Sequence, residues 1–167
     1  VIFLHGLTGN GYQLQHFAQH LNQEFRVITL DFRGRGNSSK PNQDSNLDTH
    51  VQDVIDLIEI LELKRVVLVG YSMGGFIAAK VASQLPLSKL VLLDGCANMD
   101  EHQNNIVEPT FERLKNTYPS QENYVETVVG NYAKMGVKDS LELRTAIAYE
   151  IKEENNVWIP KSYPNAI

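Results

Sequence analysis

Cysteine is almost absent from this 167-residue sequence, since Cys96 is the only one. A single cysteine cannot form an internal disulfide, so no disulfide within the chain can stabilise the fold. Disulfides form and persist mainly in oxidising compartments. A reducing, cytoplasmic location is therefore the expectation.

Positive charge and long apolar runs are also scarce. The chain has 15 Lys and Arg against 20 Asp and Glu, a net charge of -5, and the basic residues form no cluster. Nucleic-acid-binding domains present a basic surface, so no nucleic-acid partner is expected. No apolar stretch approaches the ~18 residues that a membrane-spanning helix needs.

The first residues, VIFLHG, lack a start methionine and the basic region of a signal peptide. They resemble a strand that is already under way. The sequence therefore predicts that this chain is a fragment whose beginning is missing.

Hydrophobic residues make up 43% of the chain, which suits one domain with a substantial core. Four apolar runs alternate with segments of helical periodicity. Strands as apolar as these must be covered on both faces, which predicts an α/β fold with a mostly parallel sheet flanked by helices. The predicted strands are 1–4, 26–31, 65–70 and 89–94, and the predicted helices between them are 14–21, 47–63 and 73–84.

The pattern changes near residue 97, after which no further strand is predicted. Amphipathic helices are expected over 109–118, 122–135 and 140–154, and the closing NNVWIPKSYPNAI predicts no regular structure. The expected organisation is an α/β part over 1–96 and a helical part over 97–167.

The stretch GYSMGG at 70–75 places Ser72 between a predicted strand and a predicted helix. This is the context of a G-x-S-x-G nucleophile elbow, a turn so tight that glycines must flank the serine. The Met73 N–H then points into the same space, where the helix dipole favours negative charge. The alternative is a nucleotide-binding turn, but GYSMGG lacks the G-x-G-x-x-G spacing and the Walker lysine of such turns.

A second loop, His5-Gly6-Leu7-Thr8-Gly9, follows the first predicted strand. Its glycines allow a backbone N–H, that of Leu7, to turn toward the Ser72 oxygen. Two N–H groups would then hold the oxyanion of a tetrahedral intermediate. His5 is expected to brace this loop rather than to act as a base.

Three motifs, LHGLTG (4–9), DFRGRGNS (31–38) and GYSMGG (70–75), resemble those of the α/β-hydrolase superfamily, in its single-domain esterase, lipase and dehalogenase-like branch. The resemblance covers residues 1–96, and the helical part resembles the cap that this family inserts. It implies Ser72 as nucleophile and an oxyanion hole from Leu7 and Met73. In this comparison Asp31 and Arg33 belong to a supporting loop, with structural roles.

The sequence departs from the order of that family, in which an acid and then a histidine follow the serine. Four of the five histidines precede Ser72, and only His102 follows it. Asp94 ends the strand beside the nucleophile strand. Asp94 and His102 are thus candidates for acid and base, although bracing the loop is the more common role of such an aspartate. We expect the missing acid and histidine to lie outside this chain.

The predicted function is hydrolysis of a carboxylic ester, or a related acyl or C–X bond, in a small-molecule substrate. No metal or organic cofactor is implied. One alternative is a lyase of menaquinone biosynthesis, succinyl-hydroxycyclohexadiene-carboxylate synthase, which carries an arginine where this chain has Phe76. Another is a non-catalytic binding protein of the same fold. Aromatic residues of the helical part are expected mostly in its core rather than in a pocket wall: Phe111, Tyr118, Tyr124, Tyr132 and Trp158.

Overall fold

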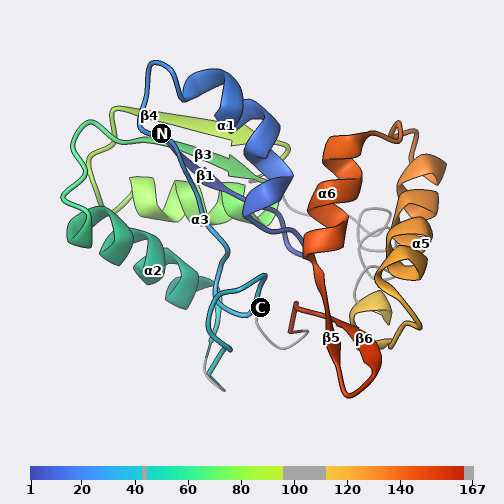
Figure 1. The fold of residues 1–167 in the computed structure, drawn as a ribbon. Helices are drawn as coiled ribbons and strands as arrows, with labels where there is room; N and C mark the ends of the chain where they lie inside the picture. Colours follow the sequence, from blue (N-terminus) through green and yellow to red (C-terminus); the bar gives the residue numbers. More distant parts are fainter. Residues whose placement is uncertain (43–44, 96–111, 164–167) are drawn as a thin grey trace.

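The computed structural model describes residues 1–42, 45–95 and 112–163. A four-stranded parallel sheet with strand order β2-β1-β3-β4 forms its centre (Figure 1). The α/β class and the parallel arrangement are therefore confirmed. The strands are β1 (Ile2–Leu4), β2 (Ile28–Thr29), β3 (Val67–Tyr71) and β4 (Lys89–Leu93).

Helices cover both faces of this sheet, as the apolar strands require. The short η1 (Gly11–Leu14) and α1 (Gln15–Leu21) pack on one face, and α2 (Leu47–Ile60) and α3 (Met73–Ala82) pack on the other (Figure 1). Successive side chains of a strand point to opposite faces. Phe3 accordingly joins the apolar cluster beneath α1, while Leu4 joins the cluster beneath α2 and α3.

Helix α2 shows how the sequence determines an element. The Asn46 side chain accepts a hydrogen bond from the Thr49 N–H, and the Thr49 hydroxyl accepts one from the Asn46 N–H, which makes a capping box. The buried side chains of the helix recur at helical spacing and face the sheet: His50, Val51, Val54, Ile55 and Ile58.

Strand β4 forms one edge of the sheet and is the least covered strand. Leu90, Val91 and Leu92 are each about two-fifths exposed, at 38%, 38% and 40%. An exposed apolar edge strand can pair with another segment or another chain.

The residues after 112 form a separate apolar cluster around η2 (Arg113–Lys115), α5 (Gln121–Lys134) and α6 (Leu141–Tyr149). Figure 1 shows them beyond the carboxyl ends of the strands. Each α-helix begins after a serine that accepts a backbone hydrogen bond, Ser120 for α5 and Ser140 for α6. None of the helices in the described ranges has the length and apolarity needed to cross a bilayer.

Three predictions for this region are wrong: that no strand follows residue 97, that a helix extends to residue 154, and that the closing segment has no regular structure. Helix α6 ends at Tyr149, and an antiparallel hairpin follows, with strands β5 (Ile151–Glu154) and β6 (Val157–Pro160). The two turn residues, Asn155 and Asn156, have φ values of 53° and 63°. Asparagine adopts such angles more readily than most residues, and two of them in sequence match the tight turn of a hairpin.

The aromatic residues of the helical part lie mainly in its core, as expected. Tyr118 and Tyr124 are buried, and Tyr132 and Trp158 pack against the same cluster. Phe111 lies outside the described residues. The predicted helix over 109–118 is reduced, within the described residues, to a short 3-10 turn at η2.

Candidate active site

Ser72 lies where β3 ends and α3 begins, with φ 51° and ψ -118°. A non-glycine residue at such a φ is strained by about 1–3 kcal/mol and persists only when its surroundings hold it. The Ser72 N–H donates to Leu93 O at 3.0 Å, and the Ser72 carbonyl accepts from the Gly75 N–H at 2.8 Å. Its hydroxyl makes no hydrogen bond within the described residues.

Two glycines make this turn possible. A Cβ on Gly70 would lie 2.2 Å from Gly74 O, and a Cβ on Gly74 would lie 2.3 Å from Leu4 O. Both obstacles are backbone atoms, which no side-chain rotation can move away. The elbow therefore packs directly against the end of β1 because these two positions have no side chain.

The loop after β1 folds as a turn from Gly6 to Gly9, closed by a 3.1 Å hydrogen bond from the Gly9 N–H to Gly6 O. Leu7 and Thr8 are its two central residues. A Cβ on Gly6 would lie 3.4 Å from the Ser72 Cβ. The structure thus brings this turn, Ser72 and the first residue of α3, Met73, to one place at the carboxyl edge of the sheet.

His5 braces the turn through both ring nitrogens. Its Nε2 accepts from the Phe32 N–H at 3.1 Å, so Nδ1 carries the proton and donates to Gly6 O at 2.7 Å. Burial lowers the pKa of His5 to about 4, which keeps the ring neutral near pH 7.

The brace also sets the direction of the Leu7 N–H. The peptide between Gly6 and Leu7 is trans, so its N–H points away from the Gly6 oxygen that His5 holds. Among the described residues this N–H has no acceptor. Met73 is the first residue of α3, and the first N–H groups of a helix have no partner within the helix.

Arg35, which sequence reasoning did not single out, holds the other side of the turn. Its Nε donates to Leu7 O at 2.6 Å, and its Nη1 donates to Gly34 O at 3.0 Å. The side chain is almost fully buried, and burial lowers its pKa to about 10. The signal that pointed to it was the arginine at the centre of Gly-Arg-Gly in DFRGRGNS.

Asp31 organises the loop that follows β2. Its carboxylate accepts from the Gly11 N–H at 2.7 Å, the Asn37 N–H at 3.0 Å and the Tyr149 hydroxyl at 2.7 Å. Burial, followed by the bond to Asp31, raises the pKa of Tyr149 to about 12. These three hydrogen bonds give Asp31 a structural role, as the sequence predicted.

Arg33 pairs with Asp53 of α2, with an Nε–Oδ2 distance of 2.7 Å. The predicted structural role of Arg33 is thus confirmed as well.

The family model described as "alpha/beta hydrolase fold" matches residues 1–150. The chain belongs to the alpha/beta hydrolase family.

Individual relatives agree with this family. The AB hydrolase superfamily protein YisY of Bacillus subtilis is 36% identical over 101 residues, which are 58% of this chain and 38% of YisY. Epoxide hydrolase 4 of Mus musculus is 34% identical over 98 residues, 56% of this chain and 27% of its own. The matches thus span well under half of these relatives.

A solved structure, that of E-2-(acetamidomethylene)succinate hydrolase, has the same fold. It superposes with a TM-score of 0.86 at 20% identity, covering 99% of this chain and 62% of the other. At that identity the likeness concerns the fold alone.

The candidate acid of this alpha/beta hydrolase, Asp94, and its candidate base, His102, are less well defined. Asp94 directly follows β4, has a φ of 49° and is exposed. Leu93, the residue before Asp94, pairs with Tyr71 in the parallel sheet, so Asp94 lies on the same sheet edge as the elbow. No hydrogen bond joins Asp94 to Ser72 or to a histidine within the described residues. His102 lies outside those residues.

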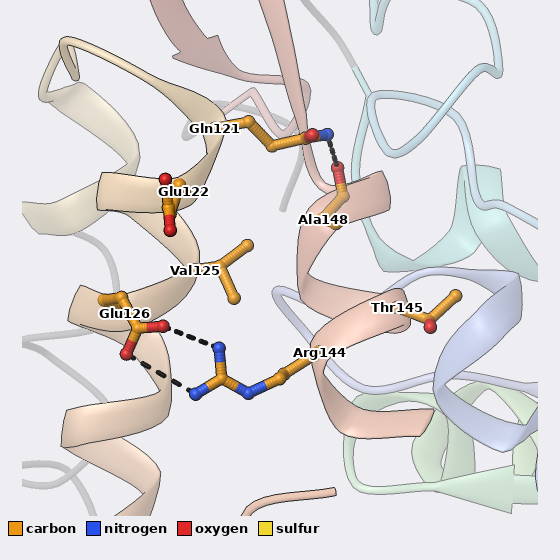
Figure 2. Close-up of a pocket in the computed structure, with 7 residues that line it drawn as sticks. All are labelled: Gln121, Glu122, Val125, Glu126, Arg144, Thr145 and Ala148. Carbon is orange, nitrogen blue, oxygen red and sulfur yellow. Dashed lines mark hydrogen bonds and ion pairs between the residues drawn. The ribbon is translucent and has the colours of Figure 1, made fainter. Parts of the chain in front are cut away.

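Two hollows lie near the helical part. An open groove of about 290 Å³ lies between α5 and α6. Figure 2 shows its lining residues, among which the Arg144 guanidinium pairs with Glu126. A larger cavity of about 450 Å³ lies between α1 and α6 and is lined by Gln13, Tyr132 and Glu150, among others. Neither is lined by Ser72. Of these two, only the larger reaches the candidate site. Gln13, which lines it, accepts a hydrogen bond from the Gly6 N–H at 3.0 Å.

Proposed function

We propose that this alpha/beta hydrolase cleaves a carboxylic ester of a small molecule through Ser72. The observation that carries the proposal is the strained Ser72 beside the Gly6–Gly9 turn. We assign the oxyanion hole to the N–H groups of Met73 and Leu7, since the Leu7 N–H has no acceptor among the described residues and the Met73 N–H begins α3. A nucleophile next to two converging donors is the arrangement that acyl transfer needs.

In the proposed reaction the Ser72 oxygen attacks the ester carbonyl carbon, and the carbonyl oxygen becomes an oxyanion held by the Leu7 and Met73 N–H groups. A base takes the serine proton and passes it to the alcohol as the C–O bond breaks. Water then attacks the acyl-serine by the same route and releases the acid. Losing one such oxyanion donor typically costs about 2.7–4 kcal/mol of barrier.

His5 is not the base of this proposal. Both of its nitrogens are bound to backbone groups, and its pKa of about 4 leaves little basicity for a proton transfer near pH 7. His102 with Asp94 is one candidate pair, and a histidine outside residues 1–167 is the alternative that we favour.

The proposal extends to the organisation of the chain. We assign residues 1–96 to the hydrolase core and 97–167 to a cap, because the described residues after 112 have their own apolar cluster beyond the strand ends. The reducing, cytoplasmic location expected from the single cysteine belongs to the same proposal. Phe76 gives the lyase alternative no support, since it offers no positive charge for a substrate carboxylate.

Hydrolysis of p-nitrophenyl butyrate by the protein expressed from its natural reading frame tests this function. Ser72→Ala is expected to lower kcat by at least about a thousand-fold, since the nucleophile of a triad carries most of the rate. The matched control is Ser83→Ala at the opposite end of α3, whose hydroxyl only donates to Lys80 O, and it is expected to keep the parent rate. Equal turnover by Ser72→Ala and the parent would reject catalysis by Ser72, and no turnover by the parent would favour a binding protein.

A further inference from the structure

The helical part contacts the core through a restricted set of polar contacts. Within the described residues, every hydrogen bond between 112–163 and 1–95 ends on one of two loops, 8–10 or 31–37. These loops follow β1 and β2, and the first begins inside the turn that carries Leu7. The hydrogen bonds of the helical part to the core therefore end on these two loops, one of which begins inside the turn of the candidate site.

The contact to the turn comes from Arg113. Its Nη2 donates to the Thr8 Oγ1 at 3.1 Å across 105 residues of sequence. Its Nη1 donates to Glu150 Oε2 at 2.9 Å and also to the Tyr124 hydroxyl, which itself donates to Glu150 at 2.7 Å.

The Arg113 guanidinium is held firmly. The Arg113 and Glu150 side chains are only 9% and 8% exposed. Breaking a buried pair of this kind leaves an uncompensated charge, so the guanidinium has few other positions to adopt. Thr8 is thus bonded to a group that the helical part fixes rather than to a mobile surface arginine.

The two central residues of the turn are consequently held by two guanidinium groups. Arg35, from the core, holds the Leu7 carbonyl, and Arg113, from the helical part, holds the Thr8 hydroxyl. Between these two bonds lies the Leu7–Thr8 peptide. A shift of Thr8 would tilt Leu7 and, with it, the N–H that our proposed function assigns to the oxyanion hole.

We propose that Arg113 is a positioning residue that couples the helical part to the oxyanion turn through Thr8. This inference rests on the proposed function for its catalytic consequence. The coupling itself is a property of the fold and is measurable without activity.

The test uses two variants of Thr8 in the natural protein. Thr8→Val keeps the shape of the side chain but removes the acceptor for Arg113, while Thr8→Ser keeps the hydroxyl. Thr8→Val is expected to lower kcat for p-nitrophenyl butyrate on the order of ten-fold with KM nearly unchanged, because misplaced catalytic groups act on the transition state. Thr8→Ser is expected to stay within about three-fold of the parent kcat.

Amide hydrogen exchange supplies the readout that needs no catalysis. Thr8→Val is expected to speed exchange in peptides covering residues 6–9, and Thr8→Ser is not. Ser140→Ala controls for simple loosening of the helical part: it removes the N-cap of α6, at the opposite end of that helix from Glu150, and should speed exchange in 141–149 while leaving kcat unchanged.

The outcomes separate the two proposals. Equal exchange over residues 6–9 in Thr8→Val and Thr8→Ser, or equal kcat for both in an active protein, would overturn the coupling. Retained turnover in Ser72→Ala would instead overturn the proposed function, and faster exchange in Thr8→Val alone would still support the coupling.

Discussion

A single methyl group on Gly74 should disrupt the junction between the elbow and β1. A Cβ at this position would lie 2.3 Å from Leu4 O, 2.6 Å from Leu4 C and 2.8 Å from His5 O. Carbon atoms pack best at about 3.5–4.0 Å, so the end of β1 or the start of α3 must move.

The expected loss of stability follows from two opposing terms. Overpacking costs about 1–3 kcal/mol, and immovable backbone atoms put Gly74→Ala at the upper end. Replacing a helical glycine by alanine recovers about 0.5–1 kcal/mol. The net loss is about 2 kcal/mol, which lowers Tm by roughly 4–8 °C in a domain of this size.

Calorimetry and labelling of Ser72 by a fluorophosphonate together measure this effect. The labelling rate should fall on the order of a hundred-fold, since the displaced atoms lead into the Gly6–Gly9 turn. Gly130→Ala is the control: it lies exposed in α5 with no atom within 4 Å of its built Cβ, and it should raise Tm slightly. If Gly74→Ala kept the Tm and labelling rate of the parent, the packing of the elbow against β1 would be refuted.

Three further predictions concern the surroundings of the site. His5 has a pKa of about 4 in the folded protein and of 6.5 in the unfolded chain, so between these pH values only the unfolded chain binds a proton. The free energy of unfolding should therefore fall by about 3 kcal/mol as the pH is lowered from 6.5 to 4. Urea unfolding should show this slope in the parent and a flatter one in His5→Asn, and equal slopes would contradict it. Asn156→Val should cost about 1–2 kcal/mol at its φ of 63°, whereas Asn156→Gly should cost nothing; equal Tm values would disprove the strain. Asp53→Asn should cost less than about 1 kcal/mol, and less still in high salt, because its pair with Arg33 is a quarter exposed; a larger or salt-independent loss would argue for a deeper role.

Local pattern was sufficient to predict most of the core. The apolar runs around Ile2, Ile28, Leu68 and Leu90 are all strands, and they pair in parallel because the helices between them cover both faces. The position of Ser72 also followed from local chemistry, since glycines on both sides of a serine between strand and helix leave few other structures.

Features that depend on distant partners were not predictable in the same way. Arg113 is a single charge in an amphipathic segment, and its role depends on Glu150, Tyr124 and Thr8, which lie 11 to 105 residues away. Nothing in the local sequence distinguishes such an arginine from a solvated one. The hairpin was missed for another reason, because IKEE continues the helical pattern of α6. The sequence signal for the hairpin was the Asn155-Asn156 pair, since both residues adopt positive φ in its turn.

Mass mapping after fluorophosphonate treatment of the natural protein tests whether Ser72 is the nucleophile. We expect one adduct per chain, located on the peptide that contains Ser72 and absent from Ser72→Ala. Ser83→Ala should be labelled at the parent rate. An adduct on another residue, or unchanged labelling of Ser72→Ala, would show that Ser72 is not the nucleophile.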